Sequence, residues 1–157
     1  MLCKAERVFT FGARSSKSLA MYFGYLLGSF RKEVYQLSHD PGFIYDRILL
    51  NVTKKDIIVF CSAWPCTKET INIANFCHSR GVPIALITNT NLNPITKVAT
   101  SVIDTNSVNY SSGGTALMAV LEVIAEEVGR KMAPESTRNI EKIESTLKDN
   151  DLIFWGY

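Results

Sequence analysis

Two hydroxyl side chains, Ser62 and Thr67, flank a short polar segment in the middle of the chain. The segment follows residues 56–61, where an acid and then a run of apolar and β-branched residues predict a buried strand. Residues 68–80 after it have the pattern of a helix. A loop between a parallel strand and a helix lies beside free amide groups at the positive end of the helix dipole. The spacing therefore predicts an anion site, and phosphate is the anion that such a site binds with least added machinery.

A second group of possible phosphate ligands follows the first predicted strand, residues 7–11. Gly12 permits a sharp turn out of this strand, and Ser15 and Ser16 can cap the next helix and donate to a ligand. Arg14 between them can bind a phosphate through two parallel hydrogen bonds. We expect the two groups to serve one site, because a parallel sheet binds its ligands at the C-terminal ends of its strands.

Short apolar strands and helices alternate along the chain, which predicts a parallel sheet covered by helices on both faces. With right-handed crossovers the result is a three-layer αβα sandwich with a five-stranded parallel sheet. The predicted strands are residues 7–11, 32–37, 56–61, 82–88 and 101–104, and the predicted helices are residues 18–28, 43–52, 68–80, 115–132 and 135–148. The helix at 115–132 carries more apolar surface than one sheet face covers, which together with the first helix favours a two-fold subunit interface.

The bulk composition excludes several classes of protein. The 157 residues are 46% hydrophobic and 20% charged, which suits one globular domain and argues against disorder. The net charge of +2 is spread along the chain, so we expect no nucleic-acid footprint. No apolar run approaches the ~18 residues of a membrane span, and the N-terminus lacks the apolar region of a signal peptide. We expect a cytoplasmic protein with reduced cysteines and with neither a metal nor another cofactor.

Taken together, these motifs resemble the SIS (sugar isomerase) domain, and in particular the C-terminal effector domain of RpiR-type bacterial transcriptional regulators. The resemblance covers residues 5–132. It depends on the order and spacing of five segments: residues 11–16, 54–56, 67–71, 80–88 and 93–95. It implies a flavodoxin-like fold in which two loops hold the phosphate of a sugar phosphate. Matched residue by residue, it implies that Ser16 serves in the first loop and that Ser62 and Thr67 serve in the second.

Two residues of the second loop depart from the family pattern. Trp64 stands where the family has a serine, and Pro65 stands where it has a glycine. Tryptophan removes a hydroxyl donor, and proline removes a backbone N–H. Each lost hydrogen bond to a charged ligand would cost about 1.5–3 kcal/mol, and Arg14 is the residue that could replace them. Gly12, Trp64, His39 and Ser112 complete the set of candidate ligand-binding residues, whereas no residue is assigned a catalytic role.

Three functions remain open from the sequence. The first is a sugar-phosphate sensor that forms dimers or tetramers, with residues 1–134 as the binding domain and residues 135–157 as an extension that packs on it or on a partner subunit. We expect no helix-turn-helix module in this chain, and hence no DNA binding by it alone and no membrane contact. The second is an aldose–ketose phosphate isomerase, in which Glu69 would be the base, although the stronger explanation for Glu69 is that the dipole favours an acid in the first turn of a helix. The third is a degenerate dimerisation domain in which Trp64 fills the pocket.

Overall fold

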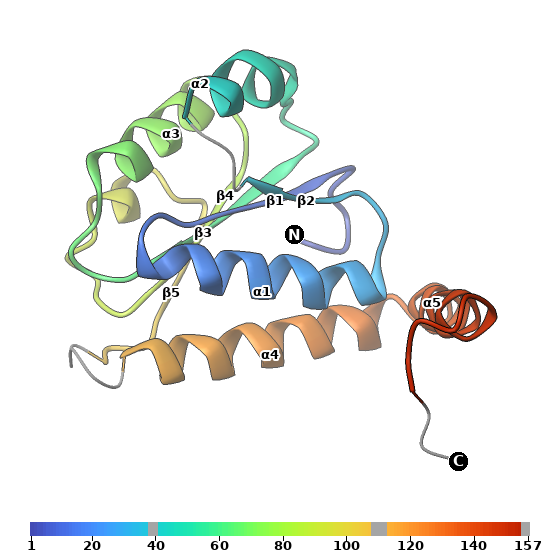
Figure 1. Cartoon of the computed structure of the whole chain (residues 1–157). Helices are drawn as coiled ribbons and strands as arrows, with labels where there is room; N and C mark the ends of the chain where they lie inside the picture. Colours follow the sequence, from blue (N-terminus) through green and yellow to red (C-terminus); the bar gives the residue numbers. More distant parts are fainter. Residues whose placement is uncertain (38–40, 108–112, 155–157) are drawn as a thin grey trace.

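Five parallel strands form the centre of the computed structural model, which describes residues 1–37, 41–107 and 113–154. The strand order is β2-β1-β3-β4-β5, so the direction of strand succession reverses between β1 and β3 (Figure 1). The strands are β1 Val8–Phe11, β2 Val34–Leu37, β3 Ile57–Ser62, β4 Ile84–Thr88 and β5 Ser101–Asp104. The predicted five-stranded parallel sheet is confirmed, including the bounds of its last strand.

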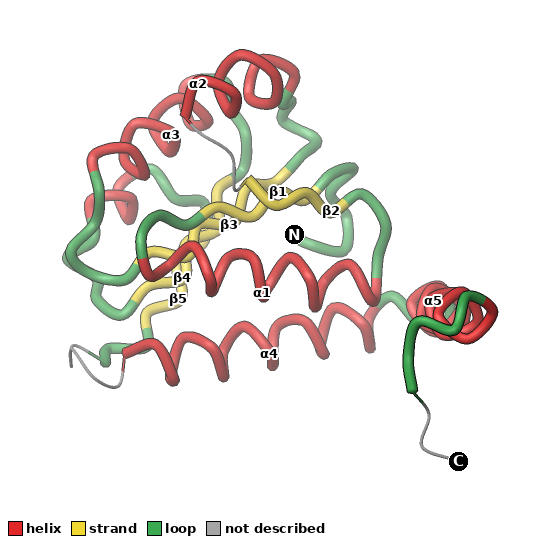
Figure 2. Tube along the Cα trace, in the orientation of Figure 1, coloured by secondary structure: helices red, strands yellow, loops and turns green. Residues whose placement is uncertain are grey.

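Helices cover both faces of this sheet and make it the middle of three layers (Figure 2). On one face α1 (Ser15–Phe30) and α4 (Gly113–Lys131) lie side by side. The opposite face is covered by α3 (Lys68–Ser79), by the helical stretch of α2 (Pro41–Phe43), a π turn (Ile44–Ile48) and a 3₁₀ turn (Leu49–Asn51), and by the 3₁₀ turn Pro94–Lys97. The predicted αβα sandwich is therefore confirmed.

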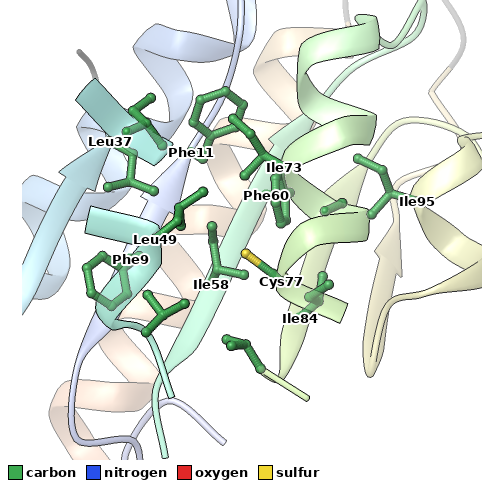
Figure 3. Close-up of a cluster of buried hydrophobic side chains, with 14 of the residues drawn as sticks. Phe9, Phe11, Leu37, Leu49, Ile58, Phe60, Ile73, Cys77, Ile84 and Ile95 are labelled. Carbon is green, nitrogen blue, oxygen red and sulfur yellow. The ribbon is translucent and has the colours of Figure 1, made fainter. Parts of the chain in front are cut away.

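Two hydrophobic cores follow from the alternation of side chains along the strands. Along β3, whose residues are all buried, Ile58 and Phe60 point to the α3 layer (Figure 3), while Ile57, Val59 and Cys61 point to α1 and α4. Each fully buried side chain of this size contributes about 1.5–3 kcal/mol. Burial on both sides explains why β3 reads as a continuous apolar run.

The first helix begins earlier than the sequence suggested. It starts at Ser15 rather than near residue 18, and its N-terminal flanking residue is Arg14, whose side chain makes no capping bond. Two backbone hydrogen bonds between residues three apart close the first turn soon after the strand: Ser16 N donates to Ala13 O, and Lys17 N donates to Arg14 O. Ser15 and Ser16 therefore lie inside the helix, and the prediction that they cap it is wrong.

The last helix, α5 (Glu135–Asp149), lies across the ends of α1 and α4 (Figure 1). Asn139 donates to the carbonyls of Gly28 and Ser29 at the end of α1, and buried Ser136 donates to the carbonyl of Gly129 in α4. The tail that follows was expected to dock through its apolar residues. Its described residues 151–154 stay exposed in the single chain, with Phe154 at 92%.

None of the helices in the described part of the chain combines the length and the apolar character that a membrane crossing requires.

Candidate functional site

A cleft of about 840 Å³ opens at the C-terminal ends of β1 and β3, where the strand order reverses. This is the position at which open parallel sheets bind ligands. Its walls come from the start of α1, the loop of residues 62–67, the start of α3, Asn89 after β4, and one side of α4. Segments from four separate parts of the chain therefore contribute to one concave surface.

The first wall depends on a close approach of two backbone segments at Gly12. A Cβ on Gly12 would lie 2.2 Å from the carbonyl oxygen of Ser16 and 3.1 Å from that of Cys61. Only glycine fits there, so the turn brings the start of α1 against the end of β3. Arg14 follows with φ 54°, and both Arg14 and Ser15 are exposed where they line the cleft.

Ser16 joins the two loops. Its side chain is buried, and its Oγ accepts a hydrogen bond of 3.1 Å from the backbone amide of Ala63. No described residue accepts the hydroxyl hydrogen of Ser16, and Ser16 lines the cleft. The serine thus holds the second loop against the first and keeps a donor for a ligand.

Ser62 lines the cleft, as the family pattern implied for a ligand-binding residue, but its hydroxyl has partners within the protein. It is buried, its Oγ accepts from Asn93 Nδ2 at 3.0 Å, and it donates to Cys66 Sγ at 3.4 Å. The fully buried Asn93 also donates to the Ser62 carbonyl, at 3.1 Å. Although Ser62 lines the cleft, its hydroxyl is already engaged in bonds that hold the ends of the strands together.

The loop after Ser62 uses its first amides internally. Ala63 donates to Ser16, Trp64 donates to Asn89 Oδ1 at 2.8 Å, and Pro65 has no N–H. Trp64 is 48% exposed and is one of the residues that line the cleft. With the indole in place the cleft has a volume of about 840 Å³. The indole is therefore a wall of the cleft, and the interpretation in which it fills the pocket is not supported.

Thr67 begins α3 as predicted. Its Oγ1 accepts from the Thr70 amide at 3.2 Å and shares a 2.7 Å hydrogen bond with the Thr70 hydroxyl. The first amides of an α-helix have no acceptor inside the helix. Those of Lys68 and Glu69 therefore have no acceptor inside the helix and lie at the positive end of its dipole, although neither residue is among the described residues that line the cleft.

Two charged side chains are found among the described residues that line the cleft, Arg14 and Glu122. Glu122 Oε1 accepts a 2.6 Å hydrogen bond from the hydroxyl of Tyr22 in α1. This bond, together with some desolvation and the negative charge, raises the pKa of Tyr22. The positive charge of Arg14 lies beside the helix N-termini. The negative charge of Glu122 lies farther along α4, where that helix packs against α1.

Glu122 was missed by the sequence reasoning, as were Thr115, Met118 and Ala119. The signal was present, because these four residues follow the i, i+3, i+4, i+7 pattern of one helix face. In the sequence this pattern is hard to tell from the apolar positions of the same helix that pack in the core.

The candidate ligand residues gather as expected in most cases. Those that line the one cleft are Arg14, Ser15, Ser16, Ser62, Trp64 and Thr67. Gly12 shapes the turn beneath it, and Glu69 is not among the described lining residues. His39 and Ser112 lie outside the described residues. Within the described part of the chain, no group of three or more His, Cys, Asp or Glu side chains could hold a metal ion.

Comparison with known proteins gives one family and several structural neighbours. A family model of the SIS domain matches residues 1–127. The sugar isomerase domain of the RpiR transcription factor from Sphaerobacter thermophilus has a TM-score of 0.79 at 22% identity, over 91% of this chain and 80% of that chain. No curated protein sequence matches the chain.

Two further neighbours represent different functions on this fold. The NanR protein of Vibrio vulnificus, complexed with ManNAc-6P, has a TM-score of 0.80 at 16% identity, over 93% of this chain and 56% of that chain. The Methanococcus jannaschii protein MJ1247, inferred to be a 3-hexulose-6-phosphate isomerase, has a TM-score of 0.67 at 16% identity, over 88% of this chain and 77% of that chain. At these identities the likeness establishes the fold alone.

Proposed function

Because the chain belongs to the SIS domain family, we propose that its cleft binds a sugar phosphate and that it is the effector and oligomerisation domain of an RpiR-type transcriptional regulator. The observation that carries the proposal is the convergence of two helix N-termini on one cleft. The start of α1 and the start of α3 are joined there by the bond from the Ala63 amide to Ser16 Oγ. A phosphate dianion suits such a place, because the positive ends of the helix dipoles favour an anion and the first amides of α3 donate to it without a buried counter-charge. In α1 the amides of Ser16 and Lys17 already donate to Ala13 and Arg14, so this helix contributes through the Ser16 hydroxyl.

In this proposal the ligand contacts differ from those of the family pattern. Ser16 donates its hydroxyl hydrogen, and the amides at the start of α3 donate from the other side. The loop donors lost at Trp64 and Pro65 are replaced by Arg14, the one cationic side chain among the described lining residues. Thr67 contributes by capping α3 and so by holding its free amides in position.

The sensor role is proposed by analogy with the RpiR transcription factor and with NanR in complex with ManNAc-6P, whose TM-scores of 0.79 and 0.80 exceed the 0.67 of MJ1247. Exposed apolar side chains of α1 and α4 that do not line the cleft, namely Met21, Tyr25 and Val123, support a two-fold contact between copies of this chain. A second copy would also cover the apolar tail, residues 151–154. In this proposal DNA is bound by a module other than the SIS domain. A sugar phosphate as ligand suits a cytoplasmic regulator.

The test is a calorimetric measurement of binding to a panel of pentose and hexose phosphates and to inorganic phosphate. Arg14→Ala is expected to weaken binding about 10- to 150-fold, since a hydrogen bond to a charged group contributes about 1.5–3 kcal/mol. The matched control is Lys17→Ala, which removes an exposed cation of the same helix turn that does not line the cleft. An equal loss in both variants, or no binding by any compound, would refute the proposal.

A second candidate function is the isomerisation of a phosphosugar, as inferred for MJ1247. Proton transfer between neighbouring carbons needs a base beside the sugar. The observation in its favour is Glu122, the one carboxylate among the described lining residues, whereas Glu69 is not among them. Turnover of an aldose phosphate to its ketose that disappears in Glu122→Gln would place the protein among the isomerases.

A further inference from the structure

One side of α4 forms a wall of the cleft that leads away from the phosphate loops. Its lining residues Thr115, Met118, Ala119 and Glu122 follow each other along one helix face. From Thr115 to Glu122 the helix rises by about 10 Å, at ~1.5 Å per residue. A ligand whose phosphate lies at the helix N-termini therefore extends along this wall toward Glu122.

The carboxylate of Glu122 is held by the neighbouring helix α1. Its Oε1 accepts the 2.6 Å hydrogen bond from Tyr22 in α1. Tyr22 follows Ser15, the first residue of α1, by a similar rise of about 10 Å. In both helices, the residue of the Tyr22–Glu122 pair thus lies about 10 Å along the helix from the anion-binding end of the cleft.

An ionised carboxylate only accepts hydrogen bonds and repels other anions. With one oxygen engaged by Tyr22, the other still accepts from a ligand. Arg14, the cation among the described lining residues, belongs to the first loop at the start of α1, so no described cation of the cleft wall stands beside Glu122 to neutralise it. The two ends of the cleft therefore favour opposite chemistry: an anion at the loops and a hydrogen-bond donor at Glu122.

We propose that Glu122, positioned by Tyr22, is a specificity-determining residue that selects sugar monophosphates with a hydroxyl or ammonium group at the end remote from the phosphate. The same residue rejects ligands that carry a second anion there, such as phosphorylated sugar acids and bisphosphates. This inference rests on the proposed function of the cleft, because it assumes that the phosphate lies at the helix N-termini.

The experiment compares matched pairs of probes that differ only in the group remote from the phosphate. Glucitol 6-phosphate is paired with 6-phosphogluconate, and ribitol 5-phosphate with ribonate 5-phosphate, so that both members of a pair are open chains that end in a hydroxymethyl group or in a carboxylate. The wild-type protein is expected to bind the alditol phosphate of a pair about tenfold more tightly than the acid. Salt at about 0.5 M is expected to reduce this ratio, because screening weakens the repulsion between exposed charges.

Glu122→Gln is expected to bring the two affinities within about twofold of each other, mainly by strengthening the binding of the acid. Tyr22→Phe is expected to reduce the ratio partly, since the carboxylate is then free to turn away. Glu126→Gln is the matched control: it removes an exposed acid one turn farther along α4 that does not line the cleft, and its ratio should equal that of the wild type.

The outcomes separate this inference from the proposed function. If inorganic phosphate and every sugar phosphate fail to bind to the wild-type protein, the proposed function is overturned, and this inference with it. If a sugar phosphate binds but the wild-type protein does not discriminate, or if Glu122→Gln keeps the wild-type ratio, only the role of Glu122 is overturned.

Discussion

Gly12→Ala is the substitution whose effect follows most directly from the structure. The added methyl group would lie 2.2 Å from the carbonyl oxygen and 2.6 Å from the carbonyl carbon of Ser16. Both atoms belong to the backbone, so no change of rotamer relieves the contact. The first turn of α1 must move away from Gly12, and this movement breaks the Ser16–Ala63 hydrogen bond that joins the two loops.

The expected cost is the sum of two effects. Overpacking a buried position typically costs about 1–3 kcal/mol, and the lost hydrogen bond costs about 1 kcal/mol. A destabilisation of about 2–4 kcal/mol corresponds to a fall in Tm of roughly 4–16 °C for a chain of this size. Because the same movement separates the two helix N-termini, phosphate binding is expected to fall below detection.

The matched control is Gly28→Ala in the same helix. A Cβ on Gly28 meets nothing within 4 Å, and alanine is the better helix former by about 0.5–1 kcal/mol. Thermal unfolding followed by circular dichroism should therefore move in opposite directions for the two variants. Equal Tm values, or a Gly12→Ala protein that binds phosphate like the wild type, would refute the reasoning about the turn.

Three further predictions concern stability and assembly. Burial acts to raise the pKa of Asp56, but hydrogen bonds from Arg7 and Thr53 and the charge of Arg7 outweigh it and lower the pKa. The stability that this carboxylate contributes is thus present above about pH 4 and is lost as the pH falls through the lowered pKa of the folded state. In urea unfolding at a series of pH values, Asp56→Asn should reduce the loss of unfolding free energy toward acid pH. Asn93→Ala removes bonds to the Ser62 carbonyl and hydroxyl and to the Ile95 amide, and should cost about 2–4 kcal/mol in urea unfolding, with no loss if those groups find other partners. Val123→Glu on the exposed side of α4 should convert dimers to monomers in sedimentation velocity, and an unchanged mass would exclude this face as the interface.

Much of the fold could be predicted because its signals are local. Strand β3 was evident from a run of apolar and β-branched residues, and the start of α3 was evident from a hydroxyl residue before a helical pattern. The Thr67 cap bonds to Thr70, three residues away, so the chain needs no distant partner to form it. Alternating strands and helices then leave a parallel sheet as the arrangement that buries both faces.

The bounds of α1 and the placement of the tail were harder to predict. The early start of α1 depends on how tightly Gly12 brings that helix against β3, which is a contact between two segments rather than a propensity. The tail was expected to pack on this domain or on a partner subunit because of its composition; Phe154 is exposed in the single chain, so packing on a partner subunit stays a prediction.

The sequence by itself therefore determined the layers of the sandwich, the loops at the strand ends and the position of the cleft, because each depends on neighbours in the chain. Only the tertiary structure decided what the polar groups of the cleft do. Ser62 bonds to Asn93, 31 residues away; Ser16 bonds to the Ala63 amide, 47 residues away; and Glu122 bonds to Tyr22, 100 residues away. Such partners meet only when strand order and helix packing bring distant segments together, and no local pattern specifies them.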